Sequence, residues 1–105
     1  MSVIANTPKP PYFAVIFTST RTDVDHGYDD MANRMVELAE QQEGFLGIES
    51  AREHVGITVS YWRDLESIRN WKTNSEHLDA QKWGRKRWYE CFKVRISKVE
   101  RDYGI

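Results

Sequence analysis

Residues 56–89 read GITVSYWRDLESIRNWKTNSEHLDAQKWGRKRWY, and this stretch decides the fold. Its first part, Ile57–Arg63, is rich in β-branched and aromatic residues and predicts a β-strand. Asp64 is a natural N-cap for a helix. The apolar residues that follow it recur at steps of three, as expected for one face of a helix: Leu65, Ile68 and Trp71. We therefore expect a strand that passes directly into a helix.

A second helix-start signal lies inside the same stretch. Residues 73–76 have the T-x-x-E form of a capping box, so we expect the helix to break near Asn74 and a fresh helix to start there. In an unbroken helix, side chains six residues apart, such as those of Trp71 and His77, point to different sides. The break is expected to turn both toward one cavity.

The remaining segments complete a β-α-β-β-α-β order. Tyr12–Thr20 is apolar on both alternating sets of residues, which is typical of a central strand that is covered on both faces. A helix is expected from Tyr28 to Gln42, capped by Asp23 or Asp25 and ended by Gly44.

Two more strands are expected around the tryptophan-rich stretch. Phe45–Glu53 and Ile57–Arg63 predict a β-hairpin. Cys91–Val99 predicts a long last strand, and its change of phase at Val99 is compatible with a bulge.

These elements predict an α+β, ferredoxin-like fold, in which a four-stranded antiparallel sheet carries its helices on one face. We expect a single domain over residues 12–105. Residues 1–11 contain all three prolines and predict an extended arm, either a frayed end or a segment that drapes over a partner. The bare face of the sheet is expected to be hidden by a second copy, which predicts a homodimer.

The composition excludes several classes of protein. The chain has 105 residues, 40% of them hydrophobic, and a formal net charge of −1, which suits a soluble domain and neither a nucleic-acid nor a membrane partner. Cys91 is the single cysteine, so no internal disulfide can form, and a buried, inert thiol is expected. Without a signal peptide or an apolar run of membrane-spanning length, the expected compartment is the cytoplasm.

The histidines and the basic residues do not indicate a metal site or a nucleic-acid site. His26, His54 and His77 are scattered along the chain, so no metal site is expected. Residues 82–89 interleave basic and aromatic side chains. This pattern favours a helix with a basic outer face and an aromatic inner face over a cationic groove that stacks bases.

All four tryptophans lie within residues 56–89. Each alone is compatible with a place in the core, as the position of Trp71 on the stripe of Leu65 and Ile68 illustrates. Taken together, Trp62, Trp71, Trp88 and Tyr89, with His77 as a titratable group, predict a pocket lined by flat rings, which suits a planar aromatic ligand.

Residues 56–89, with GFLGIES (44–50) before them and VRISKVERDY (94–103) after them, resemble the antibiotic biosynthesis monooxygenase family. The resemblance implies a dimer of ferredoxin-like subunits whose sheets face each other as an α/β barrel, with one pocket per subunit between sheet and helices. Two activities are known in such proteins. One group oxidises anthrones or phenols to quinones with O2 and no cofactor, and the other binds haem and cleaves its ring.

The resemblance also suggests roles for single positions. Trp71 matches the tryptophan that both groups use. Ser67 stands where the cofactor-independent group often has asparagine, and His77 stands where that group has tyrosine. Gln81 stands where the haem-degrading group has its iron-binding histidine, and Tyr12–Thr20 lacks the asparagine which that group uses in its first strand. The haem ligand is therefore absent and the quinone-forming set is incomplete.

We expect a small cofactor-independent monooxygenase that oxidises a hydrophobic, phenol- or anthrone-like substrate with O2. His77 would be the base, because the ordinary pKa of histidine, about 6.5, suits proton removal near neutrality. Arg85 would stabilise the oxyanion. The substrate would be held by the aromatic and polar residues of the pocket: Trp62, Ser67, Trp71, Gln81, Trp88 and Tyr89.

Two alternatives remain open at this point. The chain could be a non-catalytic dimeric ligand-binding protein of the same fold, which Ser67 and the lack of an asparagine in Tyr12–Thr20 favour. It could also be a haem-degrading monooxygenase, with haem as its cofactor and His77 as a replacement iron ligand.

Overall fold

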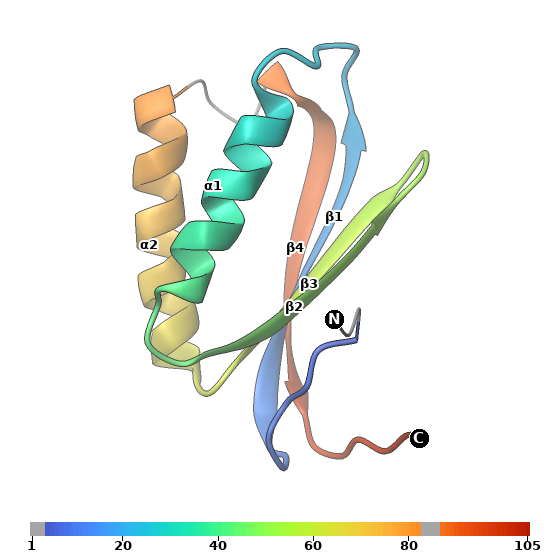
Figure 1. Cartoon of the computed structure of the whole chain (residues 1–105), viewed down its shortest axis with the longest axis vertical. Coiled ribbons are helices and arrows are strands. Elements are labelled where there is room, and N and C mark those ends of the chain that lie inside the picture. Colours follow the sequence, from blue (N-terminus) through green and yellow to red (C-terminus); the bar gives the residue numbers. More distant parts are fainter. Residues whose placement is uncertain (1–3, 83–86) are drawn as a thin grey trace.

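The computed structural model describes residues 4–82 and 87–105, with side chains for residues 4–78 and 87–105. The elements follow in the order β1 (Tyr12–Arg21), α1 (Tyr28–Glu40), β2 (Phe45–Arg52), β3 (Gly56–Trp62), α2 (Leu65–Lys82) and β4 (Tyr89–Val99). The strands form one antiparallel sheet in the order β2-β3-β1-β4, and both helices cover the same face of it (Figure 1). The predicted ferredoxin-like topology is confirmed.

Strand β1 is central, as its two apolar faces predicted, and pairs with both β3 and β4. On the helix side, Val15 packs in the core with Ala39 of α1 and Ile68 of α2. On the other side, Tyr12 is buried where residues of the N-terminal arm reach the sheet. There the Thr7 hydroxyl donates a hydrogen bond to the Tyr12 hydroxyl over 3.0 Å, and the Ala5 N–H donates to the Glu49 carboxylate over 2.8 Å.

The start of α1 differs from the prediction. The residue before the helix is Gly27, in the left-handed conformation at φ 79°, and no side chain caps the helix. The Asp25 carboxylate is instead paired with Arg21 at 2.9 Å, while the Asp25 backbone carbonyl accepts the Tyr28 N–H over 3.0 Å. Neither Asp23 nor Asp25 is therefore the predicted side-chain cap, and glycine supplies the turn at no steric cost.

The end of α1 also differs from the prediction, because the helix ends at Glu40 with Gln41 as its C-cap, before the expected end at Gln42. Gly44 does have the expected left-handed conformation, at φ 87°, but it lies in the turn between α1 and β2. A methyl group on Gly44 would also overlap the Ser67 hydroxyl, so this glycine serves both the turn and the packing of α2 against it. Asp64 caps α2 as expected, because its carboxylate accepts the Ser67 N–H over 2.8 Å.

The predicted helix break near Asn74 is wrong, because α2 is continuous from Leu65 to Lys82. The polar side chains of the supposed capping box bond backward within the helix. The Thr73 hydroxyl donates to the Arg69 carbonyl over 3.2 Å, and the Ser75 hydroxyl donates to the Lys72 carbonyl over 2.9 Å. Side chains of this type can bond to the preceding turn and leave the helix intact.

The last strand differs from the prediction in three details. The irregularity lies at its start, where the β1–β4 register shifts between Thr20 and Arg21, and Val99 pairs regularly with Tyr12. The helix expected over residues 82–89 gives way to β4 at Tyr89, and residues 83–86 lie outside the described part. Cys91 is exposed and not buried, with its sulfur 3.1 Å from the Thr20 hydroxyl.

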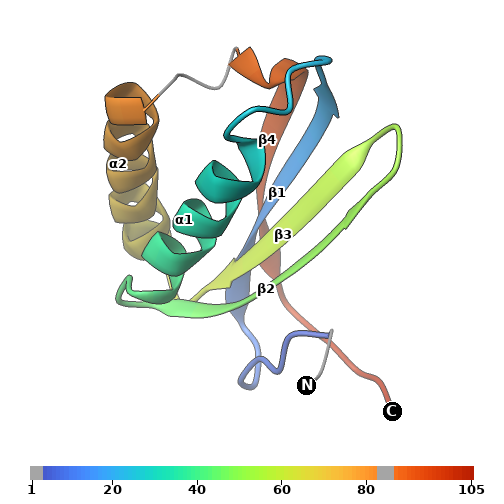
Figure 2. The ribbon, with the colours of Figure 1, turned by 45° about the horizontal axis from the view of Figure 1, so that its top comes forward.

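The core is divided into two clusters along the helices. One lies where α1 ends and α2 begins, and contains Val15, Ala39, Trp62 and Ile68. The other lies toward the start of α1 and the start of β4, and contains Met31, Leu78 and Trp88. Figure 2 shows both helices running along one face of the twisted sheet. Among the described residues, no helix combines the length and apolar character needed to cross a membrane.

Candidate ligand cavity

A cavity of about 880 Å³ lies between the sheet and the two helices, and residues of both core clusters contribute to its wall. Ligand pockets for molecules of drug size fall in the range of about 300–1,000 Å³. A smaller hollow of about 350 Å³ lies between residues 7–10 and 100–102 and is lined by proline and polar side chains. The larger space is the candidate functional site, because it lies between the sheet and both helices and has aromatic walls.

The sheet forms the floor of the cavity, and its register explains which side chains reach it. Alternate residues of a strand point to the same face, so paired rows such as Ile48–Ser60–Val15–Ile96 run across all strands on the helix side. The next row is Ser50–Thr58–Phe17–Val94. The floor is therefore hydroxyl-bearing over β2 and β3 and apolar over β1 and β4.

Strand β4 contributes apolar side chains that remain unusually exposed. Phe92, Val94 and Ile96 are 44%, 44% and 54% exposed, although all line the cavity. Exposed apolar side chains in one row commonly mark a place where a ligand or a partner binds. The ring of Phe92 also stacks with that of Phe17, with centres 5.3 Å apart.

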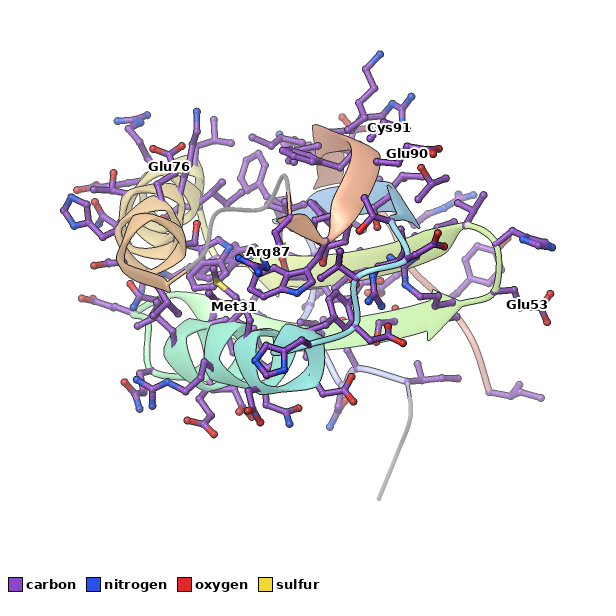
Figure 3. The ribbon with its side chains drawn as sticks, turned by 90° about the horizontal axis from the view of Figure 1, so that it is seen from above. Met31, Glu53, Glu76, Arg87, Glu90 and Cys91 are labelled. Carbon is purple, nitrogen blue, oxygen red and sulfur yellow. The ribbon has the colours of Figure 1, made fainter. Side chains whose placement is uncertain are left out.

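The helices form the opposite wall. Met31 points from α1 into the space between the helices and the sheet, whereas Glu53 points away from the tip of the β2–β3 hairpin (Figure 3). Trp71 of α2 lines the cavity, and its ring stacks on Trp62, with centres 5.8 Å apart and planes inclined by 23°. Trp62 is fully buried, and its indole N–H donates to the Ser60 hydroxyl over 2.9 Å, so it holds Trp71 from behind.

One end of the cavity is polar. The Tyr89 hydroxyl lies 3.4 Å from the Tyr28 hydroxyl, and the guanidinium of Arg21 lies 3.3 Å from the centre of the Tyr28 ring. Burial and the hydrogen bond to Tyr28 raise the pKa of Tyr89, while the positive charges of Arg52 and Arg21 act in the opposite direction. Tyr89 therefore stays a neutral hydroxyl near neutral pH, beside two cations.

The comparisons with known proteins agree with this architecture. The family model for antibiotic biosynthesis monooxygenase matches residues 11–83, more than half of the chain. The chain belongs to the antibiotic biosynthesis monooxygenase family. The chain is also 50% identical over 104 residues to the uncharacterised Bacillus subtilis (strain 168) protein YqjZ, a match that covers 97% of this chain and 91% of YqjZ.

Solved structures support the family's fold. A mutant of SnoaB, a cofactor-independent oxygenase from Streptomyces nogalater, superimposes with a TM-score of 0.71 at 10% identity, covering 87% of this chain and 95% of SnoaB. The Pseudomonas aeruginosa protein PA3566 superimposes with a TM-score of 0.65 at 17% identity, covering 91% of this chain and 99% of PA3566. At these identities the likeness is one of fold.

The structure brings only some of the sequence-predicted site residues to the cavity of this family member. Trp71, Trp88 and Tyr89 line it. Trp62 does not, because it is buried behind Trp71. Ser67 is buried against Gly44 and bonds to the Asp64 carboxylate, so its hydroxyl is used in the helix start.

His77 is exposed on α2 and is not among the cavity-lining residues. The reason is the continuous helix, which carries positions 71 and 77 to different sides. The side chain of Gln81 and the whole of Arg85 lie outside the described residues.

Some members of the family bind haem through a histidine side chain. The histidines of this chain are not placed to bind haem in the cavity. His26, His54 and His77 are all exposed, and none lines the cavity. Within the described residues, no cluster of three or more histidine, cysteine or carboxylate side chains could hold a metal ion.

Sequence reasoning missed the polar residues of β2 and β3. Arg52 lines the cavity, and its guanidinium donates hydrogen bonds to the Ser19 hydroxyl and, over 3.5 Å, to the Ser19 carbonyl. The contact spans three strands, because Arg52 pairs with Gly56, which pairs with Ser19. The signal in the sequence that could have indicated Arg52 is the predicted hairpin, which places position 52 opposite position 56.

Proposed function

We propose that the protein is a cofactor-independent monooxygenase that oxidises a hydrophobic aromatic, phenol- or anthrone-like substrate with O2. The observation that carries the proposal is the aromatic-walled cavity of about 880 Å³, whose volume and lining suit a planar ring system. Membership of the antibiotic biosynthesis monooxygenase family and the likeness in fold to the oxygenase SnoaB add support.

The proposed reaction needs an electron-rich anion of the substrate. Loss of a phenolic or carbon-acid proton gives that anion, which transfers electrons to O2. For an anthrone, one oxygen atom becomes the new quinone carbonyl and the other leaves as water, so that the substrate is oxidised and O2 is reduced without a bound cofactor.

Each part of the wall has a role in this proposal. Trp71 and the apolar row Phe92, Val94 and Ile96 hold the faces of the ring system. The hydroxyl-bearing strip of Ser50 and Thr58 hydrogen-bonds oxygen substituents on one edge of it. The largely apolar lining lets O2, a small apolar molecule, reach the bound ring system.

We also propose a cytoplasmic homodimer in which the sheets stack on their helix-free faces. The central residues of that face, Ile16 and its paired neighbour Val59, remain partly exposed in the single chain. An exposed free thiol at Cys91 suits a reducing compartment. Light scattering coupled to gel filtration tests the dimer, and a mass of one chain at micromolar concentration would refute it.

The decisive test of activity is O2 uptake in the presence of an anthrone. The expected result is O2 consumption above the rate of autoxidation, with one quinone formed per O2 consumed and no added metal or flavin. A heat-denatured sample corrects for the spontaneous reaction. O2 consumption equal to that control, for anthrones and for simpler hydroquinones, would refute the enzymatic proposal.

A non-catalytic ligand-binding protein is the second candidate, and a specific observation favours it. Among the described cavity-lining residues, Glu76 has the only carboxylate, and it is paired with Lys72 at 3.8 Å, while His77 is exposed. No described side chain is thus an obvious dedicated base. Tight binding of an anthraquinone without any O2 uptake would favour this candidate.

A further inference from the structure

The ligand cavity contains a guanidinium that lacks a protein counter-ion. Arg52 ends β2 on the helix-facing side of the sheet, and its described hydrogen bonds go to the hydroxyl and the carbonyl of Ser19. Both acceptors are neutral. Within the described part of the chain, the ion pairs involve other residues, and Arg52 has no carboxylate partner. Arg52 is itself exposed to solvent, and a cation that lines a cavity without a carboxylate partner favours a negatively charged ligand.

The backbone beneath this side chain is adapted to it. The guanidinium crosses Gly56, the residue between Arg52 and Ser19 in the same row of the sheet, and a methyl group there would overlap it. Ser19 is 2% exposed and Gly56 is also buried. These contacts hold the Arg52 guanidinium against the sheet before a ligand binds. Ligand binding therefore costs little additional side-chain entropy at this residue.

The neighbouring groups extend the polar end and leave the positive charge in excess. Arg21 lies over the Tyr28 ring and is paired with Asp25, and Tyr89 carries a neutral hydroxyl. The carboxylate of Glu76 is engaged by Lys72 on α2. An anionic oxygen at this end would meet the charge of Arg52 and the hydroxyl of Tyr89.

We infer that the cavity is selective for aromatic molecules that carry an anionic oxygen, a carboxylate or a phenolate, and that Arg52 is the residue that binds this oxygen. The inference rests on the proposed function, because it places the ligand in the same cavity. Binding to Arg52 would also favour formation of the substrate anion, which otherwise requires a dedicated base. A phenol bound against Arg52 ionises more readily and gives its proton to solvent water, and the resulting phenolate is the anion that reacts with O2.

Binding of two matched probes tests this selectivity without requiring turnover. Anthraquinone-2-carboxylate and anthraquinone-2-carboxamide have nearly the same shape and differ in charge, and each is titrated by quenching of tryptophan fluorescence. The wild-type protein is expected to bind the carboxylate at least about tenfold more tightly, because hydrogen bonds to charged groups are the stronger ones. Equal affinities for the two probes would overturn the inference while leaving the cavity intact. Failure of both probes to bind would overturn the inference and the proposed function together.

Three variants locate the preference. Arg52→Gln is expected to lose the preference for the carboxylate and to keep the affinity for the carboxamide. Gly56→Ala displaces the same guanidinium and should give the same result, which covers the case in which Arg52→Gln folds poorly. Arg34→Gln, which removes an exposed positive charge on α1, is the matched control and should retain the preference. An equal loss of affinity for both probes in Arg52→Gln and Gly56→Ala would show a merely structural role and refute the inference.

A phenol probe separates the phenolate from the carboxylate. The absorbance of 2-hydroxyanthraquinone changes when it ionises, and in the wild-type complex ionisation is expected at lower pH than in buffer. Arg52→Gln should reverse this shift. If the bound phenol ionises at the same pH as the free phenol, Arg52 binds carboxylates and not phenolates. If the bound phenol ionises at higher pH than the free phenol, the anion-binding role of Arg52 is refuted.

Discussion

The indole of Trp71 lies on the indole of Trp62, with ring centres 5.8 Å apart and planes inclined by 23°. The two rings are neighbours but have different surroundings, because Trp62 is fully buried and Trp71 forms part of the cavity wall. The pair joins the folded core to the proposed ligand site. Substitutions at the two positions should therefore separate stability from binding.

Trp71→Ala should weaken binding of anthraquinone-2-carboxamide by about tenfold or more, because the ligand loses an aromatic wall. Trp71→Phe keeps a ring at the same place and should retain most of the affinity. The neutral probe is used so that the effect of Arg52 does not enter, and the titration is followed by absorbance of the ligand. Unchanged affinity in Trp71→Ala would place the ligand elsewhere.

Trp62→Phe should have the opposite profile. The smaller ring leaves space in a fully buried site, so the free energy of unfolding should fall by about 1–3 kcal/mol. Ligand affinity of the folded fraction should change little, since Trp62 does not line the cavity. Urea unfolding measures the first quantity and ligand titration the second. A large loss of affinity with normal stability would mean that the ligand reaches Trp62.

His77→Ala should leave both ligand affinity and O2 uptake close to those of the wild-type protein. The reason is that His77 is exposed on a continuous α2 and lies away from the cavity wall. The variant is assayed beside Trp71→Ala, which should be impaired. Loss of turnover with intact binding in His77→Ala would restore the histidine as the base and show that α2 changes when the ligand binds.

Asp64 should make the stability of the protein depend on pH at the acidic end. Hydrogen bonds from Ser67 and from Arg63 lower the pKa of Asp64 to about 2 from its ordinary value of 3.8. A carboxylate with a depressed pKa stabilises the folded state above its unfolded pKa, and this contribution is lost as pH falls from about 4 through about 2.

Asp64→Asn should therefore unfold at lower temperature than the wild-type protein at pH 7, and the difference should shrink as the pH approaches 2. Circular dichroism melting at several pH values measures it. Glu53→Gln, at the exposed tip of the β2–β3 hairpin, is the control and should follow the wild-type protein throughout. A difference that stays constant with pH would show that the charge of Asp64 does not act as described.

The sequence predicted the fold well because its signals were local. The apolar faces of Tyr12–Thr20, the hairpin and the N-cap at Asp64 each depend on residues within a few positions of one another. The helix break was wrong because Thr73 and Ser75 have side chains that can bond either forward or backward. What keeps α2 continuous is a contact between residues that are far apart in the sequence. Leu78 continues the apolar stripe of α2 and is buried beside Trp88 and Met31.

The candidate site was only partly predictable for the same reason. The high number of aromatic residues in one stretch is visible in the sequence, so Trp71, Trp88 and Tyr89 were predicted as pocket residues. Arg52 was missed because its environment comes from Gly56 and Ser19 on two other strands. Trp62 was misplaced because a strand residue on the helix side can equally face a cavity or another ring.

A crystal structure with bound anthraquinone-2-carboxylate tests the central claim most directly. The account predicts that the ring system lies in the cavity between Trp71 and the Phe92–Ile96 row, with a carboxylate oxygen within hydrogen-bond distance of the Arg52 guanidinium. A complex in which the cavity is closed by the protein's own side chains and the ligand binds outside it would contradict the account.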